Sequence, residues 1–266
     1  MSAIVIDGGL VHYEAFGRGR PVLFLHGWLG SWRYWMHTME DVAAVRHRAY
    51  ALDLWGFGDS DKTRPRYQIA DYVSLVSQFV ENMGIQQAPI IGHALGATVA
   101  LEFAIQYPNR VSKIMAVSLP MSPDCINRKL VDLVNNTMMA KVMWWRQLGY
   151  KEVQSEAEKT AKEAVPVSIE SASEIDVPGR LRALTRSTST LLLAVYGEKD
   201  DIIDPTPLRS LDSDQQNIRS IGLTNSKHFP MLDEDAKFNR LLKDFLDIEG
   251  DLSALELKEE WRRRTR

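Results

Sequence analysis

Cysteine is almost absent from this sequence. Its 266 residues include one cysteine, Cys125, which excludes an internal disulfide framework. A lone thiol fits a reducing compartment. The first residues, MSAIVIDGGLV, contain neither a basic segment nor a long apolar run, so we expect no signal peptide. A cytoplasmic protein is therefore the default expectation.

Long apolar runs and an excess of one charge are also missing. No stretch approaches the roughly 18 apolar residues of a membrane-spanning helix, so we expect no membrane segment. The net charge is −3 and the basic residues are scattered, which argues against a nucleic-acid surface. The basic cluster at 262–266 follows acidic residues and is typical of a solvated, salt-bridged helix end.

What the sequence does contain is an alternation of strand-length apolar runs with helical patterns. Such alternation predicts a mostly parallel sheet with helices on both faces. We predict strands at residues 4–6, 10–13, 21–25, 49–52, 88–91, 114–117, 191–195 and 218–223, and helices at 32–45, 69–83, 97–107 and 238–246.

One region interrupts the alternation. Residues 122–186 contain no convincing strand and include a Met- and Trp-rich segment at 138–145 followed by a Glu- and Lys-rich stretch. We predict a helical insertion here, acting as a cap over the carboxyl ends of the strands. Residues 1–121 and 187–266 then form the core.

The segment GHALGA, residues 92–97, follows the apolar run at 88–91. A sharp turn from strand to helix needs small neighbours, and Gly92, Gly96 and Ala97 supply them. Such a turn aims the N–H of Leu95 and a helix N-terminus at one point. The central position, Ala94, carries only a methyl group where a nucleophile would stand.

Three further polar segments follow predicted strands: HGWLG at 26–30, YGEKDD at 196–201 and KHFP at 227–230. The carboxyl ends of parallel strands meet at one edge of a sheet, where ligands bind. Position 94, Asp200 and His228 therefore come in the order nucleophile, acid, histidine.

In these segments the chain resembles the α/β-hydrolase superfamily over about residues 4–247, including DLWGFGDS at 53–60, which is similar to the family's loop D-x-x-G-x-G-x-S. The resemblance implies an α/β-hydrolase fold with a helical cap. It also implies that Asp200 orients His228, that His228 is the general base, and that Trp28 and Leu95 donate backbone N–H groups to an oxyanion. The branches that it suggests are serine esterases, C–C hydrolases and perhydrolases.

Ala94 departs from the family pattern, since alanine cannot form a covalent intermediate. Three explanations stay open. The alanine could replace a parent serine in an engineered, inactive form. It could be natural, as in a similar G-H-A-L-G elbow of members resembling aminoacrylate hydrolase, with His228 activating water or the substrate directly. The protein could also be a catalytically silent homologue that binds a small apolar ligand or a protein partner.

Several neighbouring residues have alternative interpretations. Asp201 and Asp124 compete with Asp200 for the acid role, and the resemblance favours Asp200, because the family's G-x-x-D spacing falls there. We expect His26 to support the oxyanion loop and His93 to pack under the turn. No ligand spacing indicates a metal, and the resemblance implies no cofactor.

Aromatic side chains predict the character of the substrate. Trp144 and Trp145 fall in the predicted cap, and Trp28 lies beneath it. We therefore expect an apolar pocket and a small, fairly hydrophobic ester, amide or ketone as substrate. The sequence carries no signal of the oligomeric state.

Overall fold

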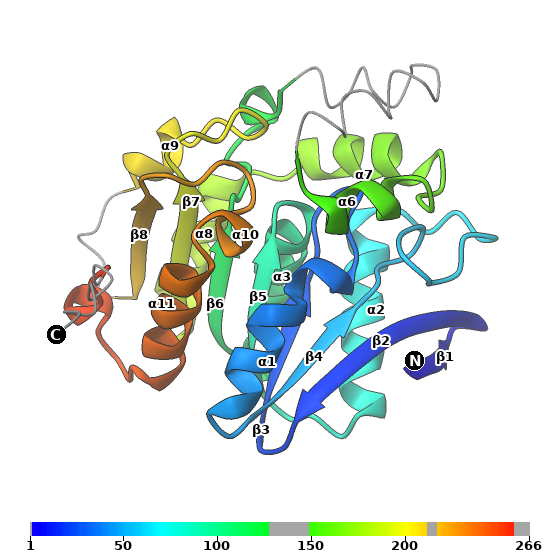
Figure 1. Cartoon of the computed structure of the whole chain (residues 1–266), viewed down its shortest axis with the longest axis horizontal. Helices are drawn as coiled ribbons and strands as arrows, with labels where there is room; N and C mark the ends of the chain where they lie inside the picture. The colour runs from blue at the N-terminus through cyan, green and yellow to red at the C-terminus, as the bar shows by residue number, and fades with distance from the viewer. Residues whose placement is uncertain (1, 128–148, 212–216, 258–266) are drawn as a thin grey trace, which may run out of the picture.

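The computed structural model describes residues 2–127, 149–211 and 217–257. Its centre is an eight-stranded sheet with the strand order β1-β2-β4-β3-β5-β6-β7-β8 (Figure 1). The strands are β1 (Ser2–Ile6), β2 (Gly9–Gly17), β3 (Arg20–Leu25), β4 (His47–Leu52), β5 (Ala88–His93), β6 (Val111–Val117), β7 (Leu191–Gly197) and β8 (Ile218–Leu223).

The first two strands run antiparallel to their neighbours, and every pair from β4 to β8 is parallel. Strand β7 is buried along its whole length, as expected for a strand covered on both faces. All predicted strands are present, and the predicted hairpin is confirmed, with Ile6 pairing with Gly9. The predicted, mostly parallel sheet is thereby confirmed.

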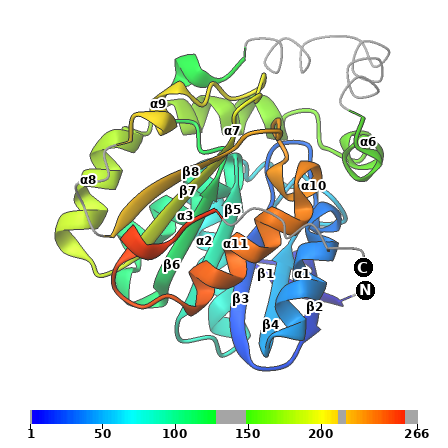
Figure 2. The same cartoon turned by 60° about the vertical axis from the view of Figure 1, so that its left-hand side comes forward.

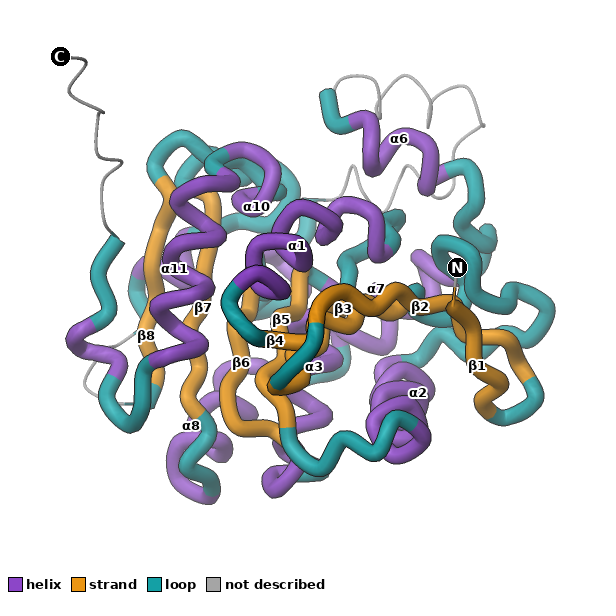
Figure 3. Tube along the Cα trace, turned by 60° about the horizontal axis from the view of Figure 1, so that its bottom comes forward, coloured by secondary structure: helices purple, strands orange, loops and turns teal. Residues whose placement is uncertain are grey.

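Helices cover both faces of the sheet. Helices α1 (Met36–Ala44) and α11 (Asp235–Asp247) lie on one face, and α2 (Ile69–Asn82), α3 (Leu95–Gln106) and α8 (Val177–Ser187) lie on the other (Figures 1 and 3). In α2 the buried side chains recur every three or four residues from Ile69 to Val80, the spacing of a helix with one face on the core.

The remaining described elements are short. They are the 3₁₀ helices η1 (Trp32–Trp35), η2 (Pro108–Arg110), η3 (Pro123–Cys125) and η4 (Leu252–Ala254), and the helices α6 (Lys151–Ala157), α7 (Ala164–Ser173), α9 (Thr206–Arg209) and α10 (Pro230–Asp233). Among the helices that the structure describes, none has the length and apolar character needed to span a bilayer.

Helices α6 and α7 fall within the predicted insertion and lie over the upper edge of the sheet, where the parallel strands end (Figures 1 and 2). The described part of that insertion forms no strand. We predicted that the insertion extends to residue 186, whereas α8 packs against α3 in the helical layer of the core. Hydrophobic side chains of α8 such as Leu184 are buried in this layer.

Candidate active site

The strand-to-helix turn after β5 holds Ala94 in a strained conformation. Its φ is 47° and its ψ is −107°, outside the regions that L-residues favour, at a typical cost of about 1–3 kcal/mol. A side chain at Gly92 would lie 2.3 Å from the carbonyl oxygen of Gly96, and one at Gly96 would lie 2.4 Å from that of Leu25. These two glycines therefore allow the turn to form and to pack against the end of β3.

The loop after β3 packs directly on this turn because Leu25 pairs with Gly92 in the sheet. A methyl group added at Gly27 would lie 3.1 Å from Ala94 Cβ. The carbonyl oxygen of Gly27 accepts hydrogen bonds from His26 Nδ1 (2.8 Å) and from the N–H of Gly30 (3.1 Å). In a trans peptide the N–H points away from the carbonyl, so the N–H of Trp28 is turned to the opposite side.

Two backbone donors are thus available beside Ala94. Neither the N–H of Trp28 nor that of Leu95 has an acceptor among the residues that the structure describes. Leu95 is the first residue of α3, whose N-terminus carries partial positive charge. Both residues are buried, so these donors can act on a developing negative charge with little competition from water.

The acid and the histidine meet at the far side of the turn. Asp200 Oδ2 accepts a hydrogen bond from His228 Nδ1 at 2.9 Å, and Asp200 Oδ1 accepts the N–H groups of Ile202 and Ile203, each at 2.9 Å. Burial alone would raise the pKa of Asp200, but the charge and hydrogen bond of His228 and these N–H donors outweigh it and lower the pKa. The ionised Asp200 thus fixes the proton on Nδ1 and leaves Nε2 as a base.

A close approach of two loops makes this pair possible. A side chain at Gly197, the last residue of β7, would lie 1.9 Å from the carbonyl oxygen of Lys227. Only a glycine lets the loop that carries Asp200 lie so near the loop that carries His228.

The competing acids lie elsewhere. The backbone oxygen of Asp201 accepts a hydrogen bond from Asn127, and Asp124 lies in the exposed part of η3. In the described part of the chain, the carboxylate bonded to His228 is that of Asp200 alone.

The loop after β4 joins the site through His26. Its Nε2 accepts the N–H of Leu54 at 2.9 Å, while its Nδ1 donates to Gly27, so the neutral ring ties two loops together. Burial lowers the pKa of His26, which favours this neutral form.

Asp53, at the start of the same loop, gathers three donors: His12 Nδ1 (2.9 Å), the N–H of Trp32 (2.8 Å) and the N–H of Asp59 (2.9 Å). His12, Asp53 and Asp59 bring ligand atoms within 4.8 Å of one another, a spacing that a metal ion could use. Because the Asp53 oxygens already accept N–H groups and Asp59 is paired with Arg33, the cluster is built as a hydrogen-bond framework that holds the loop.

In the described part of the chain, α6, α7 and the residue that precedes α6 bond to residues around the site. The indole N–H of Trp28 donates to Ser168 Oγ in α7 at 2.9 Å. Arg33 forms an ion pair at 3.1 Å with Glu156 of α6, whose carboxylate is fully buried. The hydroxyl of Tyr150 donates to Asp233, just after the histidine loop. We predicted that Trp28, Trp144 and Trp145 line a substrate pocket; the last two lie outside the described residues.

Some residues of the site escape sequence reasoning. Ser118 and Ser168 contact His228 and Trp28 across 110 and 140 residues of chain, whereas Tyr34 contacts Gly27 from seven residues away, and no motif marks these residues. The short spacing of Tyr34 from the HGWLG loop was the one available signal.

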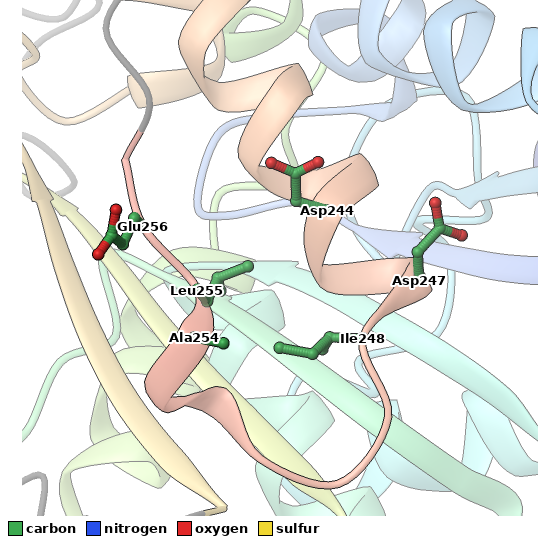
Figure 4. A pocket seen from close by; sticks show the side chains of 6 residues that line it. All are labelled: Asp244, Asp247, Ile248, Ala254, Leu255 and Glu256. Carbon is green, nitrogen blue, oxygen red and sulfur yellow. The ribbon is translucent and has the colours of Figure 1, made fainter.

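A cavity lies far from this site. It has a volume of about 290 Å³ and opens beside the last turn of α11 (Figure 4). Lys113, near the start of β6, donates to the carbonyl oxygens of Phe245 and Ile248 there, so the cavity is at the amino ends of the strands. It is lined by Asp244, Asp247, Ile248, Ala254, Leu255 and Glu256.

Comparison with known proteins supports the fold. A family model described as alpha/beta hydrolase fold matches residues 20–148. Epoxide hydrolase B of Mycobacterium tuberculosis is 35% identical over 107 residues, which is 40% of this chain and 30% of that protein. The aligned region covers about a third of the length of the curated relatives that it matches.

Solved structures match nearly the whole chain. An esterase from Exiguobacterium antarcticum has a TM-score of 0.78 at 19% identity and covers 92% of this chain and 98% of its own. The enol-lactonase from Burkholderia xenovorans LB400 has a TM-score of 0.79 at 16% identity, with coverage of 92% and 99%. At such identities the likeness shows the fold. Together, the family match and these structures show that the chain has an α/β-hydrolase fold.

Proposed function

We propose that the protein is a hydrolase in which His228, oriented by Asp200, activates a water molecule that replaces the missing nucleophile at Ala94. The observation that carries the proposal is the bond of 2.9 Å between Asp200 and His228 beside an elbow that keeps its strained turn around a methyl group. A scaffold that only bound a ligand would gain nothing from the strain at Ala94, which costs about 1–3 kcal/mol.

The reaction that we propose balances without a covalent enzyme intermediate. The water oxygen attacks the carbonyl carbon while its proton passes to His228 Nε2. The carbonyl oxygen becomes an oxyanion that accepts the N–H groups of Trp28 and Leu95. Collapse of this intermediate breaks the bond to the leaving oxygen, which takes the proton back from His228, and an acid and an alcohol are released.

The rate enhancements that these groups can supply restrict the class of substrate. A positioned general base contributes about 10²–10⁴ in rate and one oxyanion donor about 10²–10³. Without the gain from a covalent nucleophile, intrinsically labile substrates are favoured. We therefore propose activated or strained esters, including lactones, of small and fairly hydrophobic acids.

The named relatives support this substrate class in part. Solved structures of the same fold include an esterase and an enol-lactonase, and both names describe cleavage of an ester bond. Several curated relatives are named epoxide hydrolases, so an epoxide is the second substrate to test. The paired N–H donors favour the ester, because a tetrahedral oxyanion is the group that they fit.

The test is a panel of short-chain p-nitrophenyl esters, lactones and epoxides given to three forms: the unmodified protein, His228→Gln and Ala94→Ser. We expect slow ester or lactone hydrolysis by the unmodified protein and a loss of at least about 100-fold in His228→Gln, the typical contribution of a general base. Glutamine is chosen at this position because its amide resembles the histidine ring in polarity, so that the replacement disturbs the fold little.

The alternatives give different results. Strong turnover that appears only in Ala94→Ser and needs His228 would point to a disabled serine hydrolase and would contradict the water mechanism. Silence of every form across the panel would favour a binding role.

A further inference from the structure

Four buried polar groups connect the oxyanion loop to the histidine loop underneath Ala94. The N–H of Gly27 donates to the hydroxyl of Tyr34 at 2.5 Å, and this hydroxyl lies 3.0 Å from His93 Nδ1. His93 Nε2 lies 2.9 Å from the backbone oxygen of His228. Tyr34 is 2% exposed and His93 is 1% exposed, so solvent cannot substitute for any of these bonds.

In this series of hydrogen bonds, the two end groups and a neutral His93 ring determine which partner donates in each bond. The N–H of Gly27 can only donate, and the carbonyl oxygen of His228 can only accept. His93 Nε2 must therefore donate to the carbonyl oxygen of His228, and in a neutral ring His93 Nδ1 is then the acceptor to which the Tyr34 hydroxyl donates. The proton of the neutral His93 ring is thus on Nε2, where it forms the hydrogen bond to the backbone oxygen of His228.

Protonation of His93 would break this chain. A proton on Nδ1 would face the Tyr34 oxygen, and the hydroxyl hydrogen of Tyr34 would lose its acceptor. Burial, followed by the nearby charge of His228, lowers the pKa of His93 far below its ordinary value, which agrees with a permanently neutral ring. The ring centroids of His93 and His228 are 4.6 Å apart, so a neutral His93 leaves His228 as the group that takes the proton.

The two ends of this series of hydrogen bonds lie in the two loops that carry the proposed oxyanion donor and the proposed base. The N–H of Gly27 lies one peptide unit before the N–H of Trp28, the proposed oxyanion donor. The backbone of His228 bears the imidazole side chain that is the proposed base. Ser118 strengthens the second end, since its Oγ donates to the same carbonyl oxygen of His228 at 3.3 Å. The Tyr34 ring also packs edge-on against His93 and Phe229, with centroid distances of 5.5 and 5.7 Å.

We propose that Tyr34 is a positioning residue that, through His93, sets the distance between the oxyanion donor at Trp28 and the base at His228. The inference deepens the proposed function and rests on it for its effect on rate. Its geometry, a directed chain of hydrogen bonds with a neutral His93, can be tested without any activity.

The first measurement is ¹⁵N NMR of the histidine side chains of the unmodified protein. We expect His93 as the Nε2–H tautomer at every pH at which the protein is folded. A His93 ring that is protonated on Nδ1, or that titrates near neutral pH, would overturn the proposal.

The second measurement compares Tyr34→Phe with Tyr67→Phe. Tyr67 is a buried tyrosine whose hydroxyl donates to the carbonyl oxygen of Lys62 at 3.3 Å and not to Gly27, His93 or His228, so its variant is a matched control. We expect Tyr34→Phe to shift the amide signals of both Trp28 and His228 and to lower kcat about 10–100-fold with little change in KM, the scale of a small misplacement of reacting groups.

Equal effects of the two variants on these signals or on kcat would overturn the proposal. If no form of the protein hydrolyses any substrate, the proposed function fails, and the tautomer of His93 with the amide signals alone decides whether the chain of bonds exists.

Discussion

At the scale of single residues, the conformation of Ala94 makes a prediction about stability. Replacing alanine by glycine at any buried site removes a methyl group and loosens the unfolded chain, but at Ala94 it also relieves backbone strain. Ala97 lies inside α3, is buried to the same extent as Ala94 and provides the control.

We expect Ala97→Gly to lower the free energy of unfolding, and Ala94→Gly to be more stable than Ala97→Gly by about 1–3 kcal/mol, the typical cost of a sparsely populated conformation. Urea unfolding of both variants measures the difference. Equal losses would mean that the turn at Ala94 stores no strain.

At the scale of elements, a buried pair joins the N-terminal hairpin to the loop after β4. His12 of β2 donates to Asp53, and this hydrogen bond, opposed by burial and assisted by the charge of Asp53, raises the pKa of His12. A raised pKa means that the bond stabilises the fold fully below about pH 6.5, the ordinary value for histidine, and that this stabilisation is lost as the pH rises through the raised value.

We therefore expect His12→Gln to lower the free energy of unfolding by about 1.5–3 kcal/mol at low pH, the range of a hydrogen bond to a charged group, and by less at high pH. Urea titrations at about pH 6 and about pH 9 measure the gap. His37→Gln is the control, because the His37 side chain is 69% exposed. A gap for His12→Gln that is constant or grows with pH would contradict the assignment.

The elements themselves were largely predictable, because periodicity and turn residues act locally. The helix predicted from residue 97 begins at Leu95, since the strained turn at Ala94 starts the helix earlier than its apolar pattern indicates. The helix predicted at 32–45 is divided into η1 and α1. The packing of α8 on α3 was missed, because a helical pattern alone does not show which layer it joins.

At the scale of the whole molecule, the order of the site residues along the chain was predictable and their supports were not. Parallel strands bring position 94, Asp200 and His228 to one edge of the sheet, so their order carries over directly into space. Tyr34 and Ser168 act across 59 and 140 residues of chain, and such contacts depend on side-chain packing that a single sequence does not encode in any motif.

The central claim also concerns the whole molecule: a water molecule activated by His228 takes the place of the nucleophile that is missing at Ala94. The most direct measurement is the first turnover of an activated p-nitrophenyl ester by the unmodified protein, followed by stopped flow and by intact-mass spectrometry. The account predicts product release without a burst, no covalent adduct, and dependence on His228. A burst with an acyl adduct on the protein, or hydrolysis that His228→Gln leaves unchanged, would contradict it.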